Sequence, residues 1–253
     1  MNSNKVFLWN MTREEAEIAV KEADFVVLPT GSIEQHSIHL PVSTDSIRAE
    51  ELTSYLVKHS GDLKMVMLPT LYYGESLHHM HFGGTISLTE DTYVQVIKDI
   101  AWSVKQQGGQ RLLIVNYHGG NITPIQLARM QIERDIGLKV YFVGWTSFAK
   151  DLVKEWFPDV PYGHSGFYET SMIMHFNPEL VVKEKMRKQE HRYDRERPER
   201  PLTRGTGAAY FDEQYPTGGI GDPTLSKAEL AEKIIPDVTE LIVKALKEDM
   251  KYE

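Results

Sequence analysis

The sequence contains no cysteine, and this absence excludes several kinds of chemistry. A chain without thiols forms no disulfide, has no thiolate nucleophile and cannot build a cysteine zinc site. Any bound metal ion would have to be held by imidazole nitrogens and carboxylate oxygens. The chain has ten histidines and 36 aspartates and glutamates to supply them.

Long apolar runs and an excess of positive charge are also missing. No stretch approaches the ~18 apolar residues of a membrane span, and the chain does not open with the basic-then-apolar pattern of a signal peptide. The formal net charge is -8, which disfavours binding to nucleic acid or to anionic membranes. We therefore expect a cytoplasmic protein whose partner is a small molecule, with no nucleic acid and no membrane.

Four short apolar runs indicate the fold class. They lack the polar alternation of half-exposed strands, so they predict strands buried on both faces of a parallel sheet. Longer stretches with helical spacing separate them, which indicates a layered α/β fold. With 253 residues and 41% hydrophobic content, one domain spanning 1–253 is expected. The predicted strands cover residues 24–30, 64–70, 111–117 and 139–145.

Several helix ends can be predicted from their capping residues. Thr12 with Glu15 forms a capping box, and Ser226 with Glu229 predicts another at the start of the last helix. Thr89 precedes a helix that ends before Gly108.

Ionisable side chains gather where the predicted strands end. The stretch "GSIEQHSIHLPVSTD" follows the first strand and contains Glu34, His36 and Asp45. His118 follows the third strand, and Glu169 lies near the start of a later predicted helix. Because ligands of open α/β sheets bind beyond the carboxyl ends of the strands, these side chains should share one rim.

Each of these residues also has a simpler interpretation. Asp45 could be a helix N-cap, and Glu169 could complement the positive end of a helix. His118 could be a buried, hydrogen-bonded imidazole, and "HGGN" (118–121) resembles a weak phosphate-binding turn. Glu34 and His36 could belong to a polar loop.

Together, however, these residues favour a metal site. Two histidines and three carboxylates are the ligands that Zn(II), Mn(II) or Fe(II) prefer when no thiolate is present. Five ligands exceed the number that one catalytic ion usually takes from protein, whereas a bridging carboxylate would let them hold two ions. We expect Asp45 to be that bridge.

At this point the sequence resembles the creatininase (creatinine amidohydrolase) family. The resemblance implies a three-layer α/β/α sandwich with a mostly parallel sheet, a homo-oligomer that is often a hexamer, and two divalent metal ions (Zn, Mn or Fe). The segments that carry it are "LPTGSIEQHSIHLPVSTD" (28–45), "HHMHFGGTISL" (78–88), "NYHGGN" (116–121), "HSGFYETS" (164–171) and "GDPTLS" (221–226).

The resemblance also implies roles for individual residues. It assigns Glu34 and His118 to one ion, His36 and Glu169 to the other, and Asp45 to both. His164 matches a histidine thought to assist proton transfer, so that His164 and Glu169 are the expected catalytic residues. We expect the substrate to contact the residues His79, Tyr117, Gly119, Gly120 and Asn121.

The activity that the resemblance implies is hydrolysis of a C–N bond in a small cyclic amide or formamide by a metal-bound hydroxide. Other members hydrolyse a cyclic ketone derived from inositol or a peptide bond, and a non-catalytic metal or nucleotide binder is a further alternative.

Two departures from creatininase bear on the substrate. Gly119 and Gly120 stand where creatininase has an acidic residue, and only Trp145 and Trp156 lie near the positions of its substrate-enclosing tryptophans.

Two further segments are distinctive in composition. Thirteen of the eighteen residues in 183–200 are charged, which is typical of a solvated arm or a subunit contact. Residues 205–224 are rich in glycine and proline and predict a long ordered loop. His39 is expected to support the loop that carries Glu34 and His36.

Overall fold

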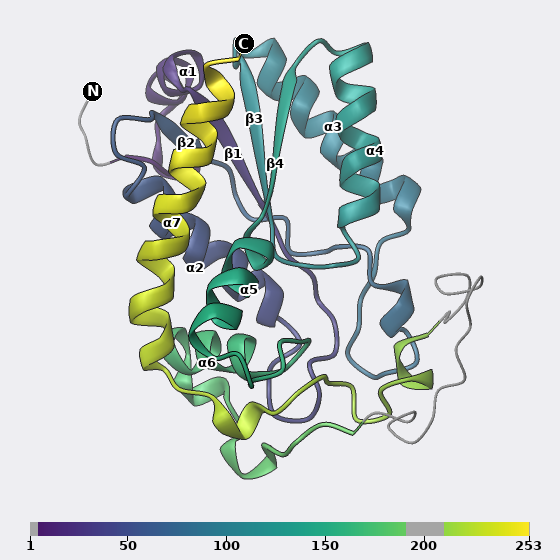
Figure 1. Cartoon of the computed structure of the whole chain (residues 1–253). Helices are drawn as coiled ribbons and strands as arrows, with labels where there is room; N and C mark the ends of the chain where they lie inside the picture. Colours follow the sequence, from purple (N-terminus) through teal and green to yellow (C-terminus); the bar gives the residue numbers. More distant parts are fainter. Residues whose placement is uncertain (1–4, 191–209, 253) are drawn as a thin grey trace.

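Four parallel strands form the centre of the molecule, in the order β2, β1, β3, β4 (Figure 1). The computed structural model describes residues 5–190 and 210–252. The strands fall where the four apolar runs predicted them, and all pairings among them are parallel. Their bounds are Phe25–Thr30 (β1), Met65–Met67 (β2), Arg111–Asn116 (β3) and Lys139–Gly144 (β4).

Helices cover both faces of the sheet. Helices α2, α5, α6 and α7 pack on one face, and α1, α3 and α4 on the other. Val27 of β1 faces the first layer, whereas its neighbour Val26 faces the second, as the alternation of a strand requires. The expected three-layer α/β/α sandwich is thus confirmed. The helices are Arg13–Glu22 (α1), Thr44–Lys58 (α2), Glu90–Gln106 (α3), Ile122–Asp135 (α4), Trp145–Trp156 (α5), Phe167–Phe176 (α6) and Glu229–Met250 (α7).

Two of the predicted helix starts are confirmed and one is wrong. Thr12 caps α1 with Glu15 in a reciprocal capping box, and Thr89 caps α3. Ser226, in contrast, does not cap the last helix, because its hydroxyl donates to the backbone oxygen of Phe167 at 3.1 Å. Helix α7 begins after Ala228 without a side-chain cap.

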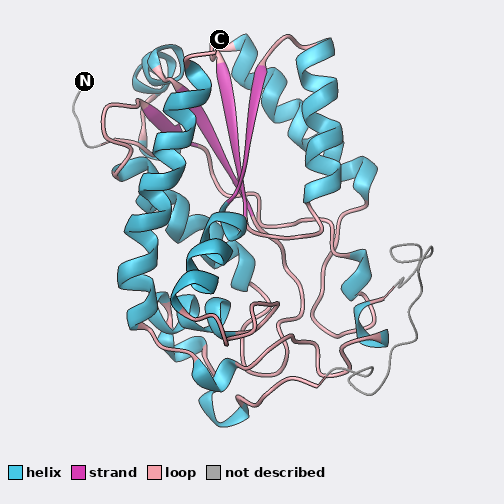
Figure 2. Ribbon diagram, viewed as in Figure 1, coloured by secondary structure: helices cyan, strands magenta, loops and turns pink. Residues whose placement is uncertain are grey.

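The register of β1 against β3 brings the ends of these strands together. Thr30 pairs with Asn116, and its hydroxyl donates to Asn116 Oδ1 at 3.0 Å. The chain therefore leaves both strands at the same level, and loops gather beyond the carboxyl ends of the strands (Figure 2). None of the described helices combines the length and the apolar character needed to cross a bilayer.

The two distinctive segments are described only in part. Residues 183–190 contain the short 3-10 helix Lys183–Lys185, and residues 191–200 lie outside the described residues. The predicted long loop is described from residue 210, and it contains two short 3-10 helices, η5 (Phe211–Glu213) and η6 (Pro223–Leu225).

Candidate metal centre

The five predicted metal ligands come together beyond the carboxyl ends of β1 and β3. Four chain segments supply them: the loop after β1, the first turn of α2, the turn after β3 and the first turn of α6. All five side chains are buried: Glu34, His36, Asp45, His118 and Glu169.

Asp45 lies between the other four ligands. Its Oδ1 is 3.5 Å from His36 Nε2, and its Oδ2 is 3.2 Å from His118 Nδ1. His118 Nδ1 is also 3.1 Å from Glu34 Oε2, whereas His36 Nε2 is 3.7 Å from Glu169 Oε2. The side chains thus form two groups that share Asp45, which is the arrangement that two ions need.

The interpretation of Asp45 as a helix N-cap is wrong. Helix α2 begins at Thr44, so Ser43 occupies the N-cap position and Asp45 lies inside the first turn. The carboxylate of Asp45 points instead toward the two histidines and Arg48.

Backbone hydrogen bonds set the tautomers of both histidines. His36 Nδ1 donates to the backbone oxygen of Glu34 at 3.1 Å, and His118 Nε2 donates to the backbone oxygen of Glu75 at 2.7 Å. The opposite ring nitrogens, which face Asp45, are then left to act as ligands. Such backbone acceptors are how proteins orient metal-binding imidazoles.

The surrounding carboxylates favour a positive charge on both histidines. Burial opposes the charged form of His36, but the carboxylates of Asp45 and Glu169 outweigh burial and raise its pKa to about 9. Likewise, Glu34 and Asp45 outweigh burial and hold the pKa of His118 well above its ordinary value. A metal ion displaces the proton of each imidazole that binds it. Two bound cations would therefore supply the positive charge that the two protonated histidines provide without metal.

Unsatisfied polar atoms also favour a bound metal. Within residues 5–190 and 210–252, Glu34 Oε1 and His36 Nε2 are buried without a hydrogen-bond partner. Leaving such atoms unpaired costs about 1–3 kcal/mol each. Glu34 and His36 also form, with Asp45, a group in which one potential ligand atom from each residue lies within 4.8 Å of the others. The nitrogen and oxygen donors fit Zn(II), Mn(II) or Fe(II).

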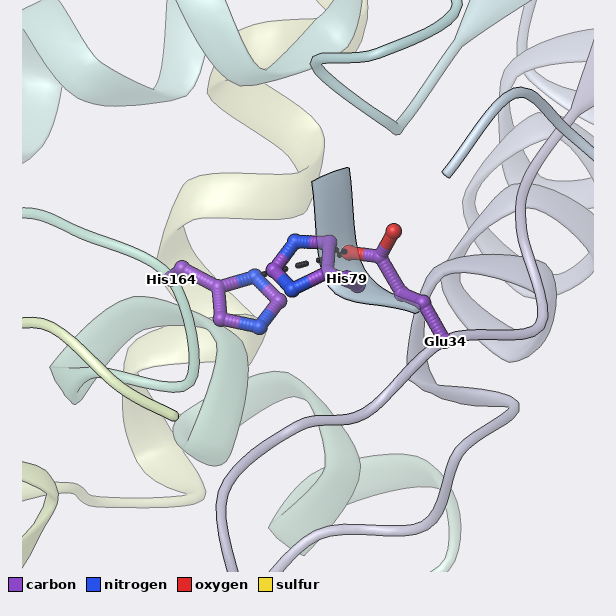
Figure 3. A group of neighbouring side chains, drawn as sticks. All are labelled: Glu34, His79 and His164. Carbon is purple, nitrogen blue, oxygen red and sulfur yellow. Dashed lines mark ion pairs between the residues drawn. The ribbon is translucent and has the colours of Figure 1, made fainter. Parts of the chain in front are cut away.

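Two further histidines approach the other carboxylate oxygen of Glu34 (Figure 3). Glu34 Oε1 is 3.5 Å from His79 Nε2 and 3.6 Å from His164 Nδ1. Sequence reasoning did not identify Gln35, which distinguishes these two imidazoles. Its Oε1 accepts from the backbone nitrogen of Ser37 at 2.9 Å, so its amide nitrogen points at the histidines.

The contacts of Gln35 give the two imidazoles opposite roles. Its amide donates to His79 Nδ1 at 2.9 Å, so the proton of neutral His79 is on Nε2 and points at Glu34. His164 Nε2 lies 2.8 Å from the backbone oxygen of Gln35 and 3.1 Å from its amide nitrogen. The shorter contact is to an atom that can only accept, so Nε2 carries the proton and Nδ1 is left as an acceptor. The Nε2–H of His79 can therefore donate a hydrogen bond into the site, and His164 Nδ1 can accept a hydrogen bond or a proton.

Glu34, His79 and His164 line a cavity of about 310 Å³. Phe211 of η5 also lines it, with its ring 4.4 Å from that of His79 and 5.2 Å from that of His164. Gly119, Gly120 and His78 also line the cavity. Phe211 lies 175 residues from His36 in sequence (211 − 36), and no local signal could have linked it to the site.

Of the other two residues predicted to contact substrate, Tyr117 lines the cavity and Asn121 does not. Tyr117 lines the cavity, although its hydroxyl is 3.1 Å from Thr53 Oγ1 in the core. Asn121 is fully buried behind the cavity, where its amide donates to Gly31 O at 2.9 Å and accepts from Glu75 N at 2.9 Å. We therefore correct its role from substrate binding to joining the loops that carry the ligands.

The two tryptophans near the site in sequence do not line the cavity. Trp145 is fully buried, and its indole nitrogen donates to the hydroxyl of Tyr168 at 3.0 Å. Trp156 packs against the core on the same side of the sheet. The aromatic lining comprises Phe211, Tyr117, Tyr162 and the imidazole rings.

His39 contacts the ligand set indirectly. Its Nε2 is 3.0 Å from the hydroxyl of Thr170, the residue after Glu169. Burial and the nearby His36 lower the pKa of His39 to about 4, so it is neutral at ordinary pH. This contact joins the loop after β1 to helix α6.

Arg48 is the most prominent feature that the sequence did not reveal. It lies one helical turn after Asp45 and is fully buried. Its Nη1 donates to Asp45 Oδ1 at 3.0 Å and to Glu169 Oε1 at 2.6 Å. An arginine three residues after a predicted ligand on the same helix was the available signal, because such residues share a helix face.

Known proteins resemble this chain over most of its length. The chain is 30% identical to a creatinine amidohydrolase from Pseudomonas putida over 198 residues, which cover 71% of this chain and 75% of that protein. It is 29% identical to a mycofactocin precursor peptide peptidase from Mycolicibacterium smegmatis, covering 84% of this chain and 80% of the relative. A 3-dehydro-scyllo-inosose hydrolase from Thermotoga maritima is 21% identical, with 97% and 84% covered.

Solved structures share the fold. A tryptophan-to-phenylalanine mutant of creatininase superposes with a TM-score of 0.81 at 24% identity, over 97% of this chain and 99% of that one. Structures described as "Creatininase Mn" and as a creatininase mutant of "Zn-Zn type" both give a TM-score of 0.79 at 24% identity, with 97% of this chain and 99% and 98% of theirs covered. The family model "Creatininase: Creatinine amidohydrolase" matches residues 9–246, and the chain therefore belongs to the creatininase family.

Proposed function

We propose that this protein is a hydrolase that holds two divalent metal ions and cleaves a C–N bond of a small cyclic amide or formamide. The observation that carries the proposal is Asp45, whose two carboxylate oxygens each face a different histidine. One position would be formed by Glu34, His118 and Asp45, and the other by His36, Glu169 and Asp45. Relatives described with manganese and with zinc support the choice of ions.

The ions would supply the electrophilic chemistry. A bound divalent ion polarises a carbonyl group and brings the pKa of water from 15.7 to about 7. His164 then accepts the proton of the attacking water at Nδ1 and passes it to the leaving nitrogen. Burial and the neighbouring His36 lower the pKa of His164, which keeps it neutral and ready to act as a base.

His79 has the complementary role in this scheme. Its Nε2–H points into the cavity beside Glu34, where it can donate to negative charge that develops on the substrate oxygen. Burial, more than any other cause, lowers the pKa of His79 to about 2, so it acts as a neutral donor. The amide of Gln35 keeps this proton on Nε2.

The size of the cavity favours a small substrate over a peptide. A volume of about 310 Å³ lies at the lower end of the range for ligand pockets, roughly 300–1,000 Å³. Phe211 lines it with a flat ring that suits a planar amide. The absence of tryptophan from its lining argues against creatinine itself as the substrate.

The test is a substrate screen on metal-stripped protein and on protein reloaded with Mn²⁺ or Zn²⁺. Lactams, N-formyl amines, cyclic ketones and short peptides would be compared by product analysis. We expect C–N cleavage of a lactam or formamide only in the loaded protein. His164→Asn should reduce kcat by about 10²–10⁴-fold at unchanged metal content. The exposed His175→Asn serves as its control. Turnover of a ketone or peptide alone, or a protein that binds no metal, would refute the proposal.

We also propose that the protein assembles as a homo-oligomer, as the family resemblance implies. Exposed apolar side chains on neighbouring helices support an association between subunits: Trp102 of α3 is 56% exposed and Met130 of α4 is 68% exposed. Light scattering of the metal-loaded protein tests this, and a monomer at micromolar concentration would contradict it.

A further inference from the structure

Two residues with hydroxyl groups line the cavity on the side of β4. Thr146 lies in the first turn of α5, directly after β4, and Tyr162 lies in the segment between α5 and α6. In the strand order, β4 is at one edge of the sheet and β2 is at the other. Because His79 follows β2, Thr146 and His79 reach the cavity from opposite edges of the sheet.

The hydroxyl of Thr146 is oriented as a donor. Its Oγ1 accepts from Arg48 Nη2 at 3.2 Å, so its hydrogen cannot point at Arg48. A hydroxyl that accepts from a charged group is polarised and becomes a stronger donor itself. Arg48 is fully buried and bound to Asp45 and Glu169, which restrains the position of Thr146 Oγ1. Thr146 can therefore present a well-placed O–H to a group in the cavity.

The hydroxyl of Tyr162 is held only weakly by the protein. It donates to the backbone oxygen of Thr146 at 3.4 Å, beyond the roughly 2.5–3.0 Å of an ordinary O–H···O hydrogen bond. Its ring stacks on that of Tyr168 with centroids 5.4 Å apart, and the Tyr168 hydroxyl accepts from the indole of Trp145. Burial raises the pKa of Tyr162 well above its ordinary value, so it is a neutral donor. A bound molecule with a better-placed acceptor would take over this hydrogen bond.

The chemistry of the lining favours an uncharged acceptor at these two hydroxyls. Among the described residues that line the cavity, none is a lysine or an arginine. The charge of Arg48 is already compensated by the carboxylates of Asp45 and Glu169. A carboxylate or phosphate group placed beside Thr146 would find no free cationic side chain, and an unpaired buried charge is costly. A carbonyl oxygen needs only the two O–H donors.

We propose that Thr146 and Tyr162 bind a second carbonyl oxygen of the substrate, so that the substrate is a cyclic imide, a ring in which two carbonyl groups flank one nitrogen. This inference rests on the proposed function, because it names the class of cyclic amide that the same site hydrolyses. His79 donates to the oxygen of the carbonyl that is cleaved, and the two hydroxyls hold the other carbonyl.

The second carbonyl also takes part in the cleavage. Hydrolysis adds the oxygen of one water molecule to the cleaved carbonyl carbon and breaks the bond from that carbon to the ring nitrogen. One hydrogen of the water ends on the nitrogen and the other on the new carboxylic acid, so the product carries one acid and one amide. While the C–N bond breaks, negative charge on the nitrogen spreads to the second carbonyl oxygen. Hydrogen bonds from Thr146 and Tyr162 strengthen as this charge develops, which favours the transition state over the bound substrate.

The experiment compares matched rings on protein loaded with Mn²⁺ or Zn²⁺: succinimide against γ-butyrolactam, and glutarimide against δ-valerolactam. The members of each pair differ only in the second carbonyl group. Because imides are intrinsically more reactive than lactams, the test is the change in the imide-to-lactam ratio of kcat/KM between wild type and variants. NMR titration of the same rings gives the corresponding ratio of Kd values where turnover of the lactam is too slow to follow.

Tyr162→Phe and Thr146→Val each remove one donor and should each lower this ratio by about tenfold. Thr146→Ser keeps a hydroxyl and should keep the ratio within about threefold of wild type. Tyr73→Phe is the control, because Tyr73 is 49% exposed and does not line the cavity. Elemental analysis of each variant checks that its metal content equals that of wild type.

An equal loss for imide and lactam would show that the two hydroxyls only support the fold, and it would overturn the inference. Cleavage of lactams or formamides without cleavage of imides would also overturn it, and the proposed function would stand. A loaded wild-type protein that cleaves no C–N bond in any of these compounds would refute the proposed function and this inference with it.

Discussion

The carboxylate of Asp45 is the one group shared by both proposed ion positions. Replacing it removes a ligand from each and leaves the positive charge of Arg48 paired only with Glu169. We expect Asp45→Ala to lose both ions and Glu169→Ala to lose mainly one, as measured by elemental analysis of protein purified without chelator. The exposed Glu155→Ala is the control. An Asp45→Ala protein with two ions would exclude the shared position.

The turn after His118 offers a matched pair of glycines. A Cβ on Gly120 would clash with Glu75 O and lie 2.5 Å from His118 Nε2, the two atoms that form a hydrogen bond there, whereas a Cβ on Gly119 would meet nothing within 4 Å. We expect Gly120→Ala to destabilise the protein by about 1–3 kcal/mol and to reduce its metal content. Gly119→Ala should change neither. Urea denaturation and metal analysis measure both effects.

How far the site could be predicted depended on the kind of residue. Glu34 and His118 were predictable as neighbours because they follow adjacent strands. Their positions in the chain, just after the strand ends, place them at the same edge of the sheet. Arg48 and Gln35 were not, because their roles depend on which way a long side chain points after packing. Phe211 belongs to a distant segment, and only tertiary structure places it over His79.

Helix α1 allows a pH-dependent test at the level of one element. The hydrogen bond from Lys5, followed by that from the backbone of Thr12, lowers the pKa of Glu15 to about 2 from 4.5. Since the folded pKa is depressed, the stabilisation is present above pH 4.5 and is lost as the pH falls through 2. NMR titration should give this value for Glu15. Lys5→Ala should raise it, and Lys21→Ala, which removes a contact with Glu17, should not.

Strand β3 lies inside the sheet between β1 and β4, and its stability depends on packing against both helical layers. Leu113 is fully buried in the layer that contains α2 and α7. We expect Leu113→Ala to reduce the free energy of unfolding by about 2–5 kcal/mol, because it leaves a cavity in the core. Leu127→Ala on the exposed surface of α4 should cost much less. Equal midpoints in urea for the two variants would contradict this prediction.

Elements defined by long patterns were predictable, and those defined by single contacts were not. The buried strands followed from continuous apolar runs such as "RLLIVN" in β3. Ser226 does not form the expected cap because its hydroxyl donates to a backbone oxygen of α6 instead. The 3-10 helix η2 (Leu77–His79), which carries His79 to the site, is too short to have a periodic signal.

Metal binding should stabilise the whole molecule, because the unfolded chain cannot assemble ligands from four segments. An ion at a hundredfold excess over its Kd contributes about 2.7 kcal/mol. For a chain of this length each kcal/mol corresponds to a Tm change of about 2–4 °C, so we expect a rise of about 5–11 °C when Mn²⁺ or Zn²⁺ is added to stripped protein. Thermal unfolding with and without chelator measures it. The Asp45→Ala protein should show no such rise.

The strand order explains why the site lies where it does. After β1 the chain moves outward to β2 on one side, and after β3 it moves outward to β4 on the other. The two neighbouring strands thus send their connections in opposite directions, and a crevice opens between them at this topological switch point. Positions such as Gly119, where a Cβ would meet nothing within 4 Å, can change in these loops without displacing the ligands. A family with this strand order can therefore acquire new substrates while it keeps one scaffold and one set of metal ligands.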